Sequence, residues 1–154
     1  MPSYNTIIKN LIKKNISISI AESCTGGKLC KIFTEIAGIS KILNVGLITY
    51  SNNSKSIFLK VSPKILKQYG AVSKEVANSM VNNLSKITKS KLCIATTGIA
   101  GPTGGNKKKP IGLVYIAIKY NKKKYLYKKI FSGNRKNIQN LAVKFCFNEV
   151  NKLI

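Results

Sequence analysis

Apolar segments of two kinds alternate along this chain, and this alternation limits its fold more than any other feature. Short runs with the character of strands occupy residues 16–21, 44–50 and 91–97. The longer stretches beside them carry apolar residues three or four positions apart, which is the spacing of a helix that packs on one face. We expect these helices at residues 3–14, 25–37, 54–59, 63–69 and 73–89. Strands that alternate with helices in this way predict a layered α/β domain.

The last part of the chain has a different pattern. Two strand-like segments, residues 111–119 and 124–131, are separated only by a short polar turn, so they predict an antiparallel hairpin. A final helix is expected over residues 135–153. The earlier strands are joined through helices, which favours parallel pairing, so the sheet should be mixed and mostly parallel. No linker or repeat interrupts the 154 residues, and we expect residues 1–154 to form a single domain.

The chain contains no His and no Asp, and this absence excludes several kinds of site. Its only carboxylates are Glu22, Glu35, Glu75 and Glu149. Without His there is no Ser-His-Asp triad, no Cys-His pair and no imidazole metal ligand. Without Asp, neither an EF-hand nor a Walker-B magnesium site can be built in its usual form. Any acid–base chemistry must therefore use Glu, Lys, Tyr, Cys or water.

The net charge of +23 comes from 27 cationic residues, of which Arg135 is the only arginine. A strongly basic chain is the first sign of a nucleic-acid-binding protein. Proteins that read phosphates usually draw on the bidentate fork of arginine, however, and this chain has lysine almost throughout. We interpret the charge as a lysine-rich surface and expect no specific nucleic-acid partner. Binding of nucleic acid and attraction of small anionic substrates remain the alternatives.

The spacing of Cys24, Cys30, Cys93 and Cys146 fits no zinc site and no Cys-x-x-Cys motif. Free thiols in a reducing compartment are therefore expected. The N-terminus lacks the apolar core of a signal peptide, and no run reaches the roughly 18 apolar residues of a membrane span. These features predict a cytoplasmic protein with no membrane partner.

Three polar clusters follow predicted strands, at the edge of an α/β sheet where ligands usually bind. The first, ESCTGG at residues 22–27, joins a strand to a helix. A hydroxyl there, such as that of Ser23, lies near unpaired backbone N–H groups that can bind an oxyanion. The alternative is structural: Ser23 or Thr25 only caps the helix, and Gly26 and Gly27 let it pack closely on the sheet.

The second cluster spans residues 50–55, where Tyr50 and Lys55 could point into one cleft. A lysine that is partly desolvated among other cations loses proton affinity and can act as a general base. The alternative is an ordinary surface lysine. The third cluster, residues 96–107, is rich in glycine but matches neither a Walker A loop nor a dinucleotide-binding fingerprint. A loop of this length in a compact domain is more often functional than a plain turn.

Four segments in this order resemble one family: AESCTGG, VGLITYSNNSK, GAVSKEVA and TTGIAGPTGGNKKKPIGLVYIAI. They are similar to the CinA C-terminal domain family, whose active members are nicotinamide mononucleotide deamidases (PncC-type amidohydrolases). The resemblance extends from Ile18 to Gly133. It implies a three-layer α/β/α domain, commonly a homodimer, without metal or other cofactor. It also implies hydrolysis of the carboxamide of nicotinamide mononucleotide to nicotinic acid mononucleotide and ammonia, a step of pyridine nucleotide salvage.

The resemblance also implies roles for individual residues. Ser23 is the nucleophile, Lys55 the base that activates it, and Tyr50 an assisting hydroxyl. The substrate contacts are expected at Thr25, Gly26, Gly27, Thr97, Gly98, Gly101, Gly104 and Arg135. Backbone N–H groups of residues 24–27 would donate hydrogen bonds to the oxyanion, and the guanidinium of Arg135 would bind the phosphate of the substrate.

The chain departs from the family pattern at two positions. Asn134 stands where an aspartate is usual, and Gln139 stands where a second arginine is usual. These changes leave open a catalytically impaired homologue that binds a nucleotide or a nucleic acid. A further alternative makes Cys24 the nucleophile, although the chain has no histidine to activate it.

Overall fold

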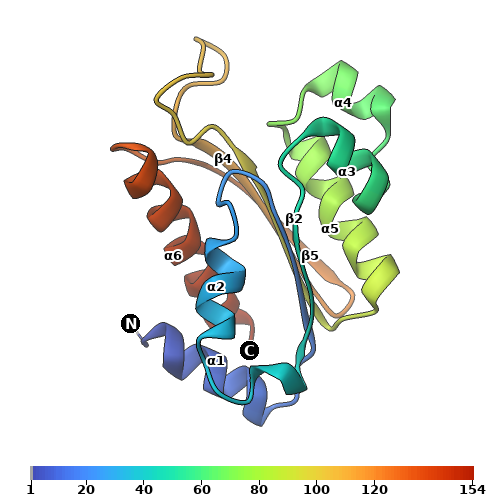
Figure 1. The fold of residues 1–154 in the computed structure, drawn as a ribbon, viewed down its shortest axis with the longest axis vertical. Coiled ribbons are helices and arrows are strands. Elements are labelled where there is room, and N and C mark those ends of the chain that lie inside the picture. Colours follow the sequence, from blue (N-terminus) through green and yellow to red (C-terminus); the bar gives the residue numbers. More distant parts are fainter. Residues whose placement is uncertain (1) are drawn as a thin grey trace.

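Helices cover both faces of one five-stranded sheet in the computed structural model, which describes residues 2–154 (Figure 1). The strands are β1 (Ile18–Glu22), β2 (Leu43–Ile48), β3 (Leu92–Gly98), β4 (Leu113–Tyr120) and β5 (Lys123–Ile130). The helices are α1 (Tyr4–Lys13), α2 (Lys28–Thr34), α3 (Asn52–Leu59), α4 (Pro63–Tyr69), α5 (Lys74–Thr88) and α6 (Arg135–Leu153), with a 3-10 turn, η1, at Ile39–Lys41. The expected three-layer α/β/α fold is confirmed.

The strands lie in the order β2-β1-β3-β4-β5. Strand β1 pairs in parallel with both β2 and β3, whereas β4 is antiparallel to both β3 and β5. Only β4 therefore runs against the other strands, which confirms a mixed, mostly parallel sheet with a C-terminal hairpin. Because β1, β2 and β3 end at the same edge, the three polar clusters that follow them are brought to one side of the molecule.

Side chains of different size cover the two faces of the sheet. Ile18 and Ile20 of β1 point into the core beneath α1, α2 and α6, while Ala21 points to α5. The same alternation recurs in β3 and β4, where Ala95 and Ala117 face α5. Successive residues of a strand point to opposite faces, so both faces are buried without interrupting the apolar run. The small alanines let α5 lie close to the central strands.

Helix α2 is shorter than the sequence predicts. It begins at Lys28 rather than at residue 25, because Gly26 and Gly27 have positive φ angles of 60° and 93° and keep the segment before the helix in a loop. It ends at Thr34 rather than at residue 37. Gly38 directly precedes η1, an element that the sequence pattern did not reveal. The residues after Glu22 therefore form a turn at the sheet edge, which matters for the site described below.

The four cysteines are free thiols, as their spacing predicts, and Cys93 and Cys146 are fully buried. Within residues 2–154, no group of three Cys or Glu side chains is arranged to hold a metal ion. Cys93 and Cys146 thus serve as small core residues.

None of the helices within residues 2–154 is both long and apolar enough to cross a bilayer.

Candidate active site

The three polar clusters meet at the carboxyl edge of the sheet around a cavity of about 310 Å³. The first cluster contributes Ser23 and Cys24, and the second contributes Tyr50 and Lys55. The remaining lining residues are Thr97, Gly98, Ile99, Ala100, Gly101, Thr103 and Gly104 of the third cluster, Ala71 and Val72 before α5, and Arg135 at the start of α6. The sheet topology thus gathers at one cavity residues that are more than 100 positions apart.

A buried hydrogen bond joins Ser23 to Lys55. The Nζ atom of Lys55 lies 3.0 Å from Ser23 Oγ, 2.8 Å from the Thr49 carbonyl oxygen and 3.1 Å from the Tyr50 carbonyl oxygen. The lysine is 1% exposed and the serine 7% exposed. Lys55 reaches this position from the first turn of α3, whose N-terminus Ser51 caps by accepting the N–H of Ser54. Lys55 is therefore not an ordinary surface lysine.

The surroundings of Lys55 favour its neutral form. Burial lowers the pKa of Lys55 to about 8, and the nearby Cys24 thiol opposes this shift only in part. Its three hydrogen-bond partners are uncharged, and two of them are carbonyls that can only accept. The Ser23 hydroxyl alone can either accept from the ammonium or donate to the neutral amine. Proton transfer by Lys55 within this cluster is therefore directed to Ser23.

The helix cap expected of Ser23 or Thr25 is supplied by Glu22. Its buried carboxylate accepts the backbone N–H groups of Gly27 at 3.1 Å, Leu29 at 3.2 Å and Cys30 at 2.8 Å. A carboxylate at the start of a helix satisfies the unpaired N–H groups and interacts favourably with the helix dipole. The capping alternative for Ser23 and Thr25 is therefore wrong, and the Ser23 hydroxyl is free to bond Lys55. The position of Glu22, directly before the glycine-rich turn, was the sequence signal for this role.

Thr25, Gly26 and Gly27 shape the turn but do not line the cavity. The Thr25 hydroxyl lies 2.9 Å from the hydroxyl of Thr96 on β3, and both residues are buried. The N–H of Gly26 bonds the Ser23 carbonyl, and that of Gly27 bonds Glu22. Among residues 23–27, the N–H groups of Ser23, Cys24 and Thr25 have no acceptor in the described part of the chain. Of the oxyanion donors expected over residues 24–27, the N–H of Cys24 is therefore the one that is both unpaired and on a residue that lines the cavity.

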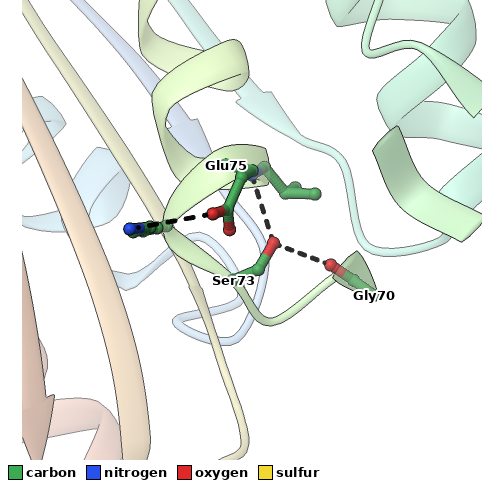
Figure 2. A network of polar contacts seen from close by, with 5 residues as sticks. Gly70, Ser73 and Glu75 are labelled. Atoms are coloured by element: carbon green, nitrogen blue, oxygen red, sulfur yellow. Dashed lines mark hydrogen bonds and ion pairs between the residues drawn. The ribbon is translucent and has the colours of Figure 1, made fainter. Parts of the chain in front are cut away.

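The wall formed by Ala71 and Val72 is held by three side chains that bind successive carbonyls. Lys109 binds the carbonyl of Tyr69, Ser73 that of Gly70 and Thr97 that of Ala71. Figure 2 shows the middle contact: Ser73 donates to Gly70 at 2.9 Å and accepts the N–H of Val76 at 3.2 Å, capping α5.

This wall also determines what Thr97 can do in the cavity. Its hydroxyl donates to the Ala71 carbonyl at 2.8 Å. The hydroxyl hydrogen is therefore used, and any contact of Thr97 with a substrate would be made by its oxygen as acceptor.

Arg135 connects the second and third clusters. Its Nη1 donates to the Gly101 carbonyl and its Nη2 to the Tyr50 hydroxyl, both at 2.7 Å. Tyr50 is 57% exposed, and its hydroxyl bonds Arg135 while its carbonyl accepts from Lys55. If Tyr50 assists Lys55, it therefore does so through its backbone carbonyl, while its hydroxyl binds Arg135. The sequence pattern did not reveal this pairing.

The two departures from the family pattern both have structural roles. Asn134 caps α6 by accepting the N–H of Asn137 at 2.9 Å, a task that asparagine and aspartate perform about equally well. Gln139, one turn further along α6, donates from Nε2 to the Cys24 carbonyl at 2.9 Å. The sequence pattern did not reveal that Ala71 and Val72 line the cavity, because apolar residues carry no chemical signature.

Comparison with known proteins places the chain in a family. The model for the CinA C-terminal domain matches residues 2–154. A CinA-like protein of Prochlorococcus marinus subsp. pastoris is 47% identical over 147 residues, which cover 94% of this chain and 34% of that protein. A competence-damage inducible protein of Thermoanaerobacter pseudethanolicus is 44% identical over 137 residues, which cover 89% of this chain and 33% of that protein. The chain thus spans about a third of the length of these relatives.

Solved structures share the whole fold. The competence/damage inducible protein CihA from Agrobacterium tumefaciens has a TM-score of 0.92 and 31% identity, over 99% of this chain and 97% of that chain. A CinA superfamily protein from Escherichia coli has a TM-score of 0.92 and 29% identity, over 99% of this chain and 91% of that chain. With the family model matched from residue 2 to residue 154, this chain belongs to the CinA C-terminal domain family.

Proposed function

We propose that this chain hydrolyses the carboxamide of nicotinamide mononucleotide to nicotinic acid mononucleotide and ammonia. The observation that carries the proposal is the 3.0 Å hydrogen bond between Ser23 Oγ and Lys55 Nζ at the wall of the cavity. A buried amine of lowered pKa beside a hydroxyl is a competent base and nucleophile for acyl transfer in a chain without histidine. Membership of the CinA C-terminal domain family supports the choice of this amide.

The proposed first half of the reaction forms an ester on the serine. Neutral Lys55 takes the hydroxyl proton as Ser23 Oγ attacks the carboxamide carbon. The N–H of Cys24 stabilises the negative oxygen of the tetrahedral intermediate, because it is unpaired and belongs to a residue that lines the cavity. The Lys55 ammonium then gives its proton to the departing nitrogen, and ammonia leaves.

The second half of the reaction repeats these steps with water. Lys55, neutral again, takes a proton from a water molecule as the water oxygen attacks the ester carbon. The intermediate collapses, the ammonium of Lys55 returns a proton to Ser23 Oγ, and the carboxylic acid product is released. The same base thus serves both halves of the reaction.

An assay of the purified chain for release of ammonia tests the proposal directly. We expect turnover of nicotinamide mononucleotide well above that of free nicotinamide, because free nicotinamide has no phosphate for Arg135 to bind. Nicotinic acid mononucleotide should form in equal amount to the ammonia. Tight binding of nicotinamide mononucleotide without turnover would contradict the proposal and favour a nucleotide-binding module. Steeply salt-dependent binding of DNA or RNA at physiological salt would favour the nucleic-acid alternative.

The rate should depend on pH through Lys55. Only the neutral amine can accept the Ser23 proton, and burial lowers the pKa of Lys55 to about 8. We therefore expect kcat/KM to rise about tenfold per pH unit below about pH 8 and to become constant above it. Steady-state rates in buffers of constant ionic strength measure this profile. A kcat/KM that does not change between about pH 6.5 and 9 would show that Lys55 is not the base.

Arg135 is expected to bind the phosphate of the substrate. Two of its N–H groups bond Gly101 and Tyr50, and the guanidinium has five in all, so donors remain for a phosphate. The change Arg135→Ala should raise KM for nicotinamide mononucleotide about tenfold to a hundredfold, the effect of a lost hydrogen bond to a charged group. The kcat should change much less. Lys136→Ala, an exposed cation beside it on α6, is the matched control. An equal loss with nicotinamide, which has no phosphate, would contradict this role.

A further inference from the structure

Gln139 joins helix α6 to the turn that carries Ser23. Its Nε2 atom donates to the carbonyl oxygen of Cys24 at 2.9 Å, across 115 positions of sequence. Glu22 and Thr25 also hold this turn, but the first bonds the N–H groups of residues 27–30 and the second bonds Thr96 through its side chain. Within residues 2–154, Gln139 is the residue that binds the Cys24 carbonyl.

Two successive peptide groups on either side of Cys24 share one arrangement. In the first, the Ser23 carbonyl accepts the N–H of Gly26 at 3.1 Å. In the second, the Cys24 carbonyl accepts from Gln139. The N–H groups of these same two peptides belong to Cys24 and Thr25, which have no acceptor within residues 2–154. Because C=O and N–H point in opposite directions in a planar trans peptide, each bond that holds a carbonyl also directs an unpaired N–H.

We propose that Gln139 is a positioning residue for the nucleophilic turn: by holding the Cys24 carbonyl it fixes Cys24, which lines the cavity beside Ser23 and whose N–H can stabilise the oxyanion. This inference rests on the proposed amide hydrolysis at Ser23. Donors that are held in place before the reaction stabilise developing charge without reorganisation, which is why the loss of one is costly.

Two variants separate the hydrogen bond from the volume of the side chain. Gln139→Met keeps an unbranched chain but has no donor, and we expect it to lower kcat about tenfold to a hundredfold with little change in KM. Gln139→Lys restores an N–H donor and should recover most of the lost kcat. Asn140→Ala is the matched control, because Asn140 is the next residue of α6 and its side chain bonds Lys28, away from the turn at Ser23. The thermal unfolding midpoints of all variants should lie within a few degrees of one another.

A second measurement tests Gln139 without reference to the natural substrate. A small fluorophosphonate labels an activated serine: Ser23 Oγ bonds to phosphorus, fluoride leaves, and the hydroxyl proton passes to Lys55. The phosphoryl oxygen then takes the place of the oxyanion. We expect Gln139→Met to be labelled at least about tenfold more slowly than the original chain, and Asn140→Ala and Gln139→Lys to be labelled at nearly its rate. Ser23→Ala should not be labelled, which identifies the site by intact mass.

The outcomes distinguish this inference from the proposed substrate. Labelling of Gln139→Met at the original rate would overturn the role of Gln139, whatever the turnover. Slow labelling of Gln139→Met in a chain that does not hydrolyse nicotinamide mononucleotide would support that role and refute the substrate. Failure of the original chain to be labelled at Ser23 would overturn the inference together with the Ser23–Lys55 mechanism.

Discussion

Replacing Ser23 with alanine is expected to lower kcat for nicotinamide mononucleotide by about 10⁴-fold or more, the scale seen when a serine nucleophile is removed. The change deletes the atom that attacks the carboxamide. Within residues 2–154, the other two partners of Lys55 Nζ are carbonyl oxygens, so no second hydroxyl can replace Ser23. The fold should survive, because Ser23 contributes one hydroxyl at the cavity wall and the turn is held by Glu22 and Thr25. Ammonia release and thermal unfolding of the variant measure the two effects.

The control for this change is Cys24→Ser, which tests the neighbouring thiol as nucleophile. Burial raises the pKa of Cys24 to about 12, with the nearby Glu22 carboxylate adding to the shift, so the thiol stays protonated near neutral pH. A protonated thiol is a poor nucleophile, and Cys24→Ser should therefore retain activity. Full turnover by Ser23→Ala, combined with loss of turnover in Cys24→Ser, would assign the reaction to the thiol instead.

Replacement of Lys55 with methionine should have the next largest effect, a loss of about 10²–10⁴-fold in kcat, which is the usual contribution of a general base. Methionine fills the volume of the buried stem but cannot accept a proton. The change leaves the carbonyls of Thr49 and Tyr50 without their partner, at a cost of roughly 1–3 kcal/mol for each buried group. Removal of a buried ammonium offsets part of this cost, so we expect the variant to fold.

Lys55→Arg distinguishes a base from a fixed positive charge. Arginine keeps the charge but is not deprotonated in proteins, so we expect it to be as inactive as the methionine variant. Substantial activity in Lys55→Arg would show that the site needs a cation and not a proton acceptor. Lys64→Met is the matched control, since Lys64 is an exposed lysine on the neighbouring helix α4 and should be replaceable without loss.

Much of the fold could be predicted because it depends on local patterns. The alternation of Ile with small residues in β1 and β3 reflects two buried faces, and the polar turn at Asn121 joins two strands that can only be antiparallel. The parallel pairing of β1, β2 and β3 then requires the clusters at Ser23, Lys55 and Thr97 to approach one another. The candidate site could be located for this reason, although none of its distances could.

Contacts between distant segments escaped prediction. The sequence offered a cap of α2 by Ser23 or Thr25 as the structural alternative, because a local pattern does not show that the Glu22 side chain turns back onto the helix. Nor did it reveal that Arg135 pairs with Tyr50, or that Gln139 binds the Cys24 carbonyl. The contacts of Arg135 and Gln139 are single hydrogen bonds between distant segments, and they depend on how helix α6 packs on the sheet.

The sequence by itself determined the order of the elements, the edge where ligands can bind and the chemical types available there: a hydroxyl, an amine and one guanidinium in a chain without histidine or aspartate. It singled out Lys55 among the lysines by its motif, but it did not show that this amine is buried. Only the tertiary structure buries that amine between two carbonyls and Ser23 Oγ, and burial is what lowers its pKa to about 8. The acidity of a side chain depends on the solvent and dipoles around it, and these are assembled only when β1, β2 and α3 pack together.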